Sequence, residues 1–266
     1  MSEATSAHVP VQVDTIDSIG IATICNDHKA NALSTNVIDG LVAALDQFAS
    51  EHARAVVLRA KPGAKIFSAG HDVGELPRDG SDPFAWTVPL EQLLRSVREA
   101  PMPVIAMCEG SIWGGACDLV VSCDMVIASP SATLAMTPAK MGLPYNPVGT
   151  SHFLGVLPLH RLKEMLFTAQ PMQPDEAMRL GVFNRVVAPD QLEDTTLELA
   201  RQIARLSPMV IRVLKDELRE LGAGAPLSAE VFERLQSARE VTWRSDDMQE
   251  GITAFFEKRA PDFKGH

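Results

Sequence analysis

Two short stretches of small residues can present backbone N–H groups to a ligand. The first is KIFSAGHDVGEL (65–76), in which Ser68, Ala69 and Gly70 follow a predicted strand. A turn of small residues leaves its N–H groups accessible, and such a turn can hold an oxyanion. A purely local reading is equally open, in which the stretch is an ordinary turn capped by Asp72.

The second stretch is EGSIWGGACDLV (109–120), which leaves the next predicted strand. Gly114 and Gly115 open a predicted helix there, and Asp118 lies about one turn into it. The first N–H groups of a helix lack intrahelical partners and favour negative charge. Asp118 either acts on a ligand or only complements the helix dipole. Because ligands gather at the carboxyl ends of strands in α/β folds, the two turns together predict one site.

A third stretch, MGLPYNPVGTS (141–151), contains the only tyrosine of the chain, Tyr145, between Pro144 and Pro147. The prolines restrict the backbone and lower the entropy of the loop. A phenol can donate a hydrogen bond to a carboxylate while its ring excludes water. Taken by itself, the stretch predicts a rigid surface turn with a partly packed tyrosine ring.

Other catalytic signatures are missing from the sequence. It has no G-x-G-x-x-G, G-x-x-x-x-G-K or G-x-S-x-G motif, and no histidine pair or acidic cluster spaced for a metal ion. We therefore expect no metal site. The net charge of -10 and the pI of about 5.2 argue against a nucleic-acid partner.

The compartment is predicted from the ends of the chain and from the cysteines. No apolar run approaches membrane-spanning length, and the first residues resemble neither a signal peptide nor a transit segment. We expect no membrane partner. The four cysteines (Cys25, Cys108, Cys117 and Cys123) lie in apolar surroundings without a C-x-x-C pair. They predict packing residues in a reducing cytoplasm.

Strands and helices alternate through the first half of the chain, which is typical of an α/β fold. Two strands are expected around a turn at Asp17 and Ser18, and Ser34 can cap the helix that follows. Pro101 should end a later helix. The expected strands are 54–60, 103–110, 124–129 and 132–136, and the expected helices are 34–50, 89–101, 114–123, 159–168, 174–181, 189–206, 207–221, 227–241 and 246–258. We predict an α/β core over 1–195 and a helical region over 196–266, with GAGAP (222–226) as a helix break.

At these motifs the chain resembles the crotonase superfamily, also called enoyl-CoA hydratase/isomerase. The matching segments are NALS (31–34), FSAGHDVGEL (67–76), EGSIWGGACDLVVSCD (109–124) and EGITAFFEKRAPDF (250–263), in that order. The resemblance implies an acyl-CoA thioester as ligand, with the N–H groups of His71 and Gly115 on the thioester oxygen. It also implies a crotonase-like spiral of ββα turns and a helical C-terminal trimerisation region, giving a homotrimer or a dimer of trimers.

Within this superfamily the acids distinguish the reactions. Hydratases carry glutamates at the positions of Asp118 and Pro138, and hydration needs both, so ordinary hydration is not expected here. The chain is most similar to the methylmalonyl-CoA decarboxylase subgroup, in which the tyrosine of the PYN loop addresses the substrate carboxylate. That residue is Tyr145. The chain departs from the subgroup at Asp118, where glutamate is expected.

The resemblance also implies contacts for the rest of the substrate. Lys29 is a candidate for a phosphate or ribose contact, and the backbone of Ala69 for the adenine or pantetheine arm. Trp113 either walls the acyl pocket or packs in the core. Lys258 and Phe255 match C-terminal residues that reach a CoA bound to a neighbouring subunit, although each lysine is equally explained as a solvated charge. The remaining predicted contacts are Gly70, Asp72 and Gly114.

The implied reaction is decarboxylation of methylmalonyl-CoA, or a related malonyl-CoA, to propionyl-CoA. The thioester carbonyl accepts the electrons, so no biotin, metal or pyridoxal is required. Asp118 could relay the proton that quenches the enolate, or serve only as a supporting group. One alternative is an enoyl-CoA isomerase or hydratase of the same superfamily that uses Asp118. Another is a non-catalytic acyl-CoA-binding protein.

Overall fold

Two sheets form the framework of the computed structural model, which describes residues 9–76, 88–222 and 228–266. The larger sheet has the order β1-β2-β3-β5-β7-β9 and the smaller has the order β4-β6-β8. Only the β1–β2 pair is antiparallel among these strands. The strands are β1 (Val11–Ile16), β2 (Ile19–Ile24), β3 (Ala55–Ala60), β4 (Ile66–Ser68), β5 (Val104–Cys108), β6 (Ser111–Trp113), β7 (Met125–Ala128), β8 (Leu134–Ala135) and β9 (Arg185–Val186).

The helices confirm most of the predicted elements to within a few residues. They are α1 (Thr35–Ser50), α2 (Pro89–Glu99), α3 (Gly115–Ser122), α4 (Pro147–Leu154), α5 (Leu159–Thr168), α6 (Pro174–Arg179), α7 (Leu192–Ala204), α8 (Pro208–Gly222), α9 (Ala229–Trp243) and α10 (Asp246–Glu257). Four short 3-10 helices join them: η1 (Asp27–Lys29), η2 (Val73–Glu75), η3 (Pro138–Met141) and η4 (Pro189–Gln191).

A repeated unit explains how distant turns meet. The pairs β3–β4, β5–β6 and β7–β8 each give their first strand to the larger sheet and their second to the smaller. A helix then returns the chain to the next pair, as expected of a spiral of ββα turns. Because β4 and β6 pair in parallel, the turns that follow them lie side by side.

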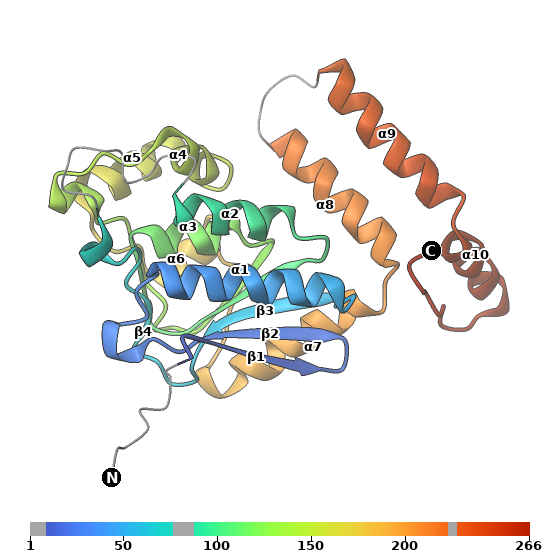
Figure 1. Cartoon of the computed structure of the whole chain (residues 1–266), viewed down its shortest axis with the longest axis horizontal. Coiled ribbons are helices and arrows are strands. Elements are labelled where there is room, and N and C mark those ends of the chain that lie inside the picture. Colours follow the sequence, from blue (N-terminus) through green and yellow to red (C-terminus); the bar gives the residue numbers. More distant parts are fainter. Residues whose placement is uncertain (1–8, 77–87, 223–227) are drawn as a thin grey trace, which may run out of the picture.

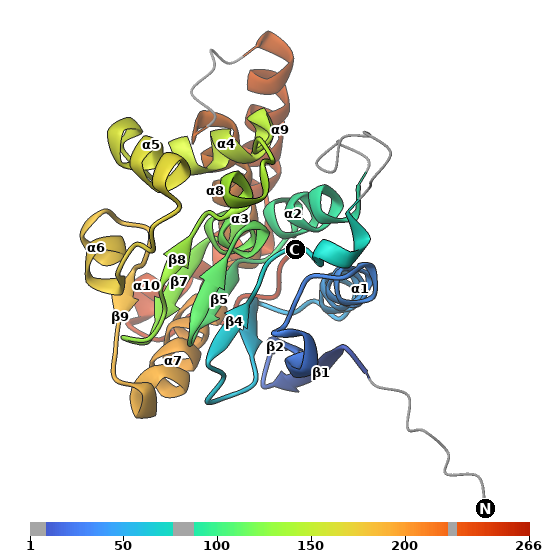
Figure 2. The ribbon, with the colours of Figure 1, turned by 90° about the vertical axis from the view of Figure 1, so that its left-hand side faces the viewer.

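Helices cover both faces of the larger sheet. In both views α1 lies on one side of it and α7 on the other (Figures 1 and 2). Every residue of β2 and β5 is buried, as in parallel sheets that are covered on both faces. One apolar cluster packs between the sheet and α1, α2 and α3, and a second packs against α7.

The C-terminal helices α8 to α10 extend away from the sheet (Figure 1). The predicted division at residue 195 falls within α7, whose Leu192, Leu197 and Ala200 pack on the sheet. A division of the chain into two domains stays a prediction. The predicted GAGAP break lies between α8 and α9, and residues 223–227 are outside the described part of the chain.

Two local predictions were wrong. The stretch 141–151 was expected to be a loop, but α4 begins within it at Pro147. Proline suits the first position of a helix, and Asn146 caps α4 by accepting a hydrogen bond of 2.6 Å from the Gly149 N–H. Ser34 lies at the N-cap position of α1 but makes no side-chain capping bond. The Thr35 N–H donates instead to the Glu75 carboxylate at 2.8 Å.

Candidate active site

The two predicted turns are in backbone contact. Gly70 has a φ of +85°, a conformation that favours glycine. A Cβ atom on Gly70 would lie 2.4 Å from the Trp113 carbonyl oxygen and 2.8 Å from the Gly115 nitrogen. Neither distance can be relieved by turning a side chain. The turn after β4 therefore packs directly on the start of α3, and only glycine at position 70 permits it.

This contact places two N–H donors together. A Cβ atom on Gly115 would lie 3.6 Å from the His71 nitrogen. Leu33 bridges the two sides of His71, because its N–H donates to Gly70 and its carbonyl accepts from Asp72. The His71 N–H therefore points away from Leu33. Within the described part of the chain, neither the His71 nor the Gly115 N–H donates a backbone hydrogen bond. Such a pair can hold an oxyanion.

The surroundings of this pair are apolar. The Cδ2 atom of Leu90, on α2, lies 2.9 Å from the position that a Cβ atom of Gly115 would take. His71 is partly buried, its Nδ1 atom is buried with no partner among the described residues, and burial lowers the pKa of His71. A neutral imidazole and an apolar wall exclude water, which strengthens hydrogen bonds from the two N–H groups.

Tyr145 and Asp118 are joined in the structure, although they were predicted separately. The Tyr145 hydroxyl donates to Oδ2 of Asp118 at 2.6 Å, and Asp118 is fully buried. Burial and the Asp118 carboxylate raise the pKa of Tyr145, so the phenol stays protonated. Gly149 makes room for this pair. A Cβ atom there would lie 2.4 Å from Cε1 of Tyr145 and 2.5 Å from Oδ2 of Asp118.

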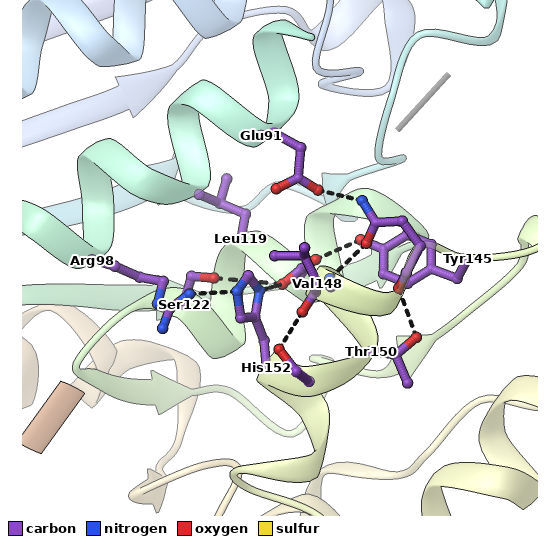
Figure 3. A network of polar contacts seen from close by, with 12 residues as sticks. Glu91, Arg98, Leu119, Ser122, Tyr145, Val148, Thr150 and His152 are labelled. Carbon is purple, nitrogen blue, oxygen red and sulfur yellow. Dashed lines mark hydrogen bonds and ion pairs between the residues drawn. The ribbon is translucent and has the colours of Figure 1, made fainter. Parts of the chain in front are cut away.

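The second oxygen of Asp118 continues the network (Figure 3). Nδ1 of His152 lies 2.7 Å from Oδ1 of Asp118, and Nη1 of Arg98 lies 2.5 Å from Nε2 of His152. The His152 side chain is almost completely buried. Sequence reasoning missed both His152 and Arg98. His152 is on α4, which was not predicted, and no local pattern distinguishes Arg98 from other arginines on amphipathic helices.

A further buried acid, also missed, supports α4. The side-chain amide of Asn146 donates to Oε1 of Glu91 at 2.5 Å. Glu91 is only 3% exposed, and its Oε2 atom has no hydrogen-bond partner among the described residues. Burial raises the pKa of Glu91. Glu91 is the third residue of α2, where leucines on both sides make it look like one of the exposed polar residues of an amphipathic helix.

Glu91→Gln should make the free energy of unfolding less dependent on pH. A raised folded-state pKa means that Glu91 contributes its full stability below its ordinary pKa of 4.5 and loses it as pH rises through the raised value. The amide cannot ionise, so the variant should gain about 1 kcal/mol at neutral pH relative to the parent. Urea unfolding from pH 4.5 upward checks this, with exposed Glu99→Gln on the same helix as control. A parallel decline in parent and variant would contradict it.

The other predicted contacts near the first turn are partly engaged. Nζ of Lys29 lies 2.9 Å from Oδ2 of Asp72, and the lysine side chain is 54% exposed. Asp72 caps η2, as its local reading predicted, by accepting from the Gly74 N–H. The Ala69 N–H donates to Ala30, which leaves the Ala69 carbonyl for a ligand. Trp113 is 38% exposed and so is not a core residue.

The C-terminal candidates do not join this site in their own chain. Phe255 is 77% exposed near the end of α10, and Lys258 is the exposed residue that follows the helix. Figure 1 shows α10 at the opposite end of the molecule from α4. Contacts of these two residues with a ligand stay a prediction.

Three further features bear on the site chemistry. In the part of the chain that the structure describes, no group of three or more His, Cys, Asp or Glu side chains could hold a metal ion. No described helix has both the length and the apolar character needed to cross a bilayer. The four cysteines are free and buried, and burial raises the pKa values of Cys108, Cys117 and Cys123. These three thiols are therefore poor nucleophiles.

Comparison with known proteins places these features in context. A family model described as enoyl-CoA hydratase/isomerase matches residues 14–266. The chain is 42% identical over 256 residues to the methylmalonyl-CoA decarboxylase of Escherichia coli strain K12, which covers 96% of this chain and 98% of that protein. It is 32% identical over 247 residues to the carnitinyl-CoA dehydratase of Salmonella arizonae, which covers 90% and 92%. A solved structure of methylmalonyl-CoA decarboxylase in complex with 2-nitronate-propionyl-CoA matches with a TM-score of 0.80 at 42% identity, covering 98% of this chain and 100% of that one.

Proposed function

The chain belongs to the enoyl-CoA hydratase/isomerase family, and on that premise we propose that it decarboxylates methylmalonyl-CoA, or a closely related malonyl-CoA, to propionyl-CoA. The observation that carries the proposal is the pair of N–H groups at His71 and Gly115, beside an acid that is not available for hydration. Asp118 is fully buried, and both of its oxygens are already engaged.

In the proposed reaction the two N–H groups hold the thioester oxygen. The C–C bond to the carboxylate breaks while it is perpendicular to the thioester plane, and its electron pair moves into the carbonyl. Negative charge on the oxygen grows as the enolate forms. Donors fixed in advance therefore bind the transition state more strongly than the substrate. The apolar wall at Leu90 keeps water from weakening these bonds.

The carboxylate end of the substrate is assigned to Tyr145. Its hydroxyl is held by Asp118, and its ring lies edge-on to Phe153 with a centroid distance of 6.3 Å. Both contacts restrict the phenol to one orientation. We infer that it orients the carboxylate and transfers no proton, because its raised pKa keeps it protonated.

Isomerisation or hydration with Asp118 as the acid–base group is the second candidate, and the dehydratase relative keeps it open. The geometry favours it less. Asp118 is fully buried and already has Tyr145, His152 and Ser122 around its two oxygens, which leaves little room for a substrate proton to reach it. Pro138 occupies the position of a second acid and has no proton to exchange. A non-catalytic binding protein is the least favoured candidate, because paired N–H donors stabilise an oxygen whose negative charge grows only during a reaction.

The remaining parts of the proposal concern the CoA moiety and the assembly. Lys29 can leave its ion pair with Asp72 and bind a phosphate of CoA. The reaction needs no added cofactor, because the thioester carbonyl accepts the electrons. Free, buried cysteines fit a cytoplasmic enzyme.

Phe255 and Phe256 are each 77% exposed beside an apolar cavity of about 420 Å³. We propose that a homotrimer, alone or paired into a hexamer, covers this surface and brings Phe255 and Lys258 to a neighbour's CoA.

Carbon dioxide release from methylmalonyl-CoA, with crotonyl-CoA hydration followed in parallel, tests the proposal. We expect release without hydration. Tyr145→Phe should then lower kcat about 10- to 100-fold, the effect of losing one hydrogen bond to a charged group. Because Asp118 loses a buried donor, the variant should also lose about 1–3 kcal/mol of stability but remain folded. Hydration without release would overturn the proposal, and unchanged Tyr145→Phe kinetics would remove Tyr145 from the mechanism.

A further inference from the structure

We propose that His152 and Arg98 are positioning residues that act through Asp118 to set the direction of the Tyr145 hydroxyl proton. The inference rests on the decarboxylation proposed above. It also gives a role to Asp118, which stands where the family resemblance leads us to expect glutamate. Four side chains form one row, from Arg98 through His152 and Asp118 to Tyr145, with contacts of 2.5, 2.7 and 2.6 Å (Figure 3). The two central side chains are buried and the two outer ones are partly exposed.

The guanidinium group fixes the protons of this row. Arginine can only donate, so Nε2 of His152 must accept the hydrogen bond from Arg98. The His152 proton is then on Nδ1, which donates to Oδ1 of Asp118. Asp118 therefore accepts hydrogen bonds at both oxygens, and the Ser122 hydroxyl also lies 3.5 Å from Oδ1. The hydroxyl proton of Tyr145 consequently points to Oδ2 of Asp118.

The segment around α4 makes this arrangement possible. Tyr145 precedes the helix and His152 is within it, so both reach Asp118 from one short stretch of chain. Gly149 lies between them, and any side chain there would occupy the space of the Tyr145–Asp118 contact. Asn146 caps the same helix and is fixed in turn by Glu91. Residues 145–152 therefore contact both oxygens of Asp118, Tyr145 from just before α4 and His152 from within it.

This direction matters because a phenol has a single proton. In the free enzyme the Tyr145 hydroxyl donates this proton to Asp118 in a hydrogen bond. A bound substrate carboxylate must therefore compete with Asp118 for the hydrogen bond. The competition weakens binding of the carboxylate in the ground state. As carbon dioxide leaves, the substrate loses its charge and the hydroxyl returns to Asp118. The proton stays on the phenol oxygen throughout, and only its hydrogen-bond partner changes. Such an interaction raises kcat more than it tightens substrate binding.

Substitutions at His152 separate this role from simple packing. In His152→Asn the amide nitrogen replaces Nδ1 as donor to Asp118, whereas His152→Ala removes the donor. We expect His152→Ala to lower kcat about 10- to 100-fold and to lower KM as well. Without His152, Asp118 is no longer held in position and can turn away from Tyr145, which leaves the hydroxyl to the substrate carboxylate. His152→Asn should restore kcat to within about threefold of the parent. Arg98→Met should shift kcat and KM in the same direction as His152→Ala, by a smaller factor.

The single tyrosine provides a readout that does not depend on activity. Protein labelled with tyrosine carrying ¹³C at Cζ should give one resonance from Tyr145. In the parent and in His152→Asn it should be displaced toward the tyrosinate position, as expected for a phenol that donates to a carboxylate. His152→Ala should move it back toward a free phenol. Exposed Ser151→Ala on α4 is the control and should change neither kinetics nor resonance.

Two results would overturn the inference. The first is a His152→Ala protein with the resonance and kinetics of the parent. The second is an equal loss in folded His152→Ala and His152→Asn, which would indicate packing alone. A parent enzyme that releases no carbon dioxide would instead overturn the proposed function, while the resonance would still report whether His152 directs the hydroxyl.

Discussion

Gly115→Val should lower carbon dioxide release by about 100-fold or more and leave the protein folded. A Cβ atom at position 115 would lie 2.9 Å from Cδ2 of Leu90 and 3.6 Å from the His71 nitrogen. The branched methyl groups would therefore enter the space in which the thioester oxygen must sit. Loss of one oxyanion donor typically costs 10²- to 10³-fold in kcat. Steady-state assays with methylmalonyl-CoA measure the effect.

The stability of this variant needs a separate measurement, because crowding against Leu90 should cost about 1–3 kcal/mol. Urea unfolding gives this value. Gly222→Val is the matched control, since among the described residues no atom lies within 4 Å of a Cβ at this end of α8. It should keep full activity. Full activity in Gly115→Val would mean that the thioester oxygen is bound elsewhere.

Gly149→Ala should impair both stability and catalysis. The added methyl group would meet Cε1 of Tyr145 at 2.4 Å, Oδ2 of Asp118 at 2.5 Å and Oδ1 of Asn146 at 2.9 Å. It would therefore separate the phenol from its carboxylate and disturb the cap of α4. We expect a loss of about 1–3 kcal/mol from overpacking and a fall in kcat of about 10-fold or more.

Gly222→Ala is the control for this change, because it also places alanine in a helix and its Cβ meets no atom of the described part of the chain within 4 Å. Urea unfolding and carbon dioxide release should be measured on both variants. An increase in stability for Gly149→Ala, as alanine gives at unconstrained helical sites, would show that the segment around Tyr145 can shift without cost. The tight packing that we assign to Gly149 would then be wrong.

The sequence was informative where structure is local. The apolar strands, the amphipathic helices and the glycine-rich turns each carry their signal within a few residues, and the family resemblance supplied their order in space. The comparisons confirm that resemblance over residues 14–266. The two N–H turns carried a local signal as well, because each contains a glycine next to the strand that it follows: Gly70, whose φ is +85°, and Gly115 at the start of α3.

The polar row behind Tyr145 was not predictable in this way. His152 is 54 residues from Arg98 and 34 from Asp118 in sequence, so nothing local connects them. Each is a single polar residue on a helix, which usually means a solvated surface position. Tyr145 was identified because it is unique, but its partner in the free protein is Asp118 rather than solvent. Only tertiary packing decides such pairings.

The contact of Gly70 with Trp113 and Gly115 is made by main-chain atoms on both sides. Changes of side chain elsewhere can therefore leave the paired N–H groups of His71 and Gly115 in place. The groups that we propose to face the reacting carbon come from a different segment, around α4. Under selection these two parts can diverge separately, because main-chain contacts hold the turns together, whereas residues 145–152 are held by contacts with one another and with Asp118. A new reaction could thus arise by replacing one short segment, and exchange of that segment between relatives would be a practical route to redesign.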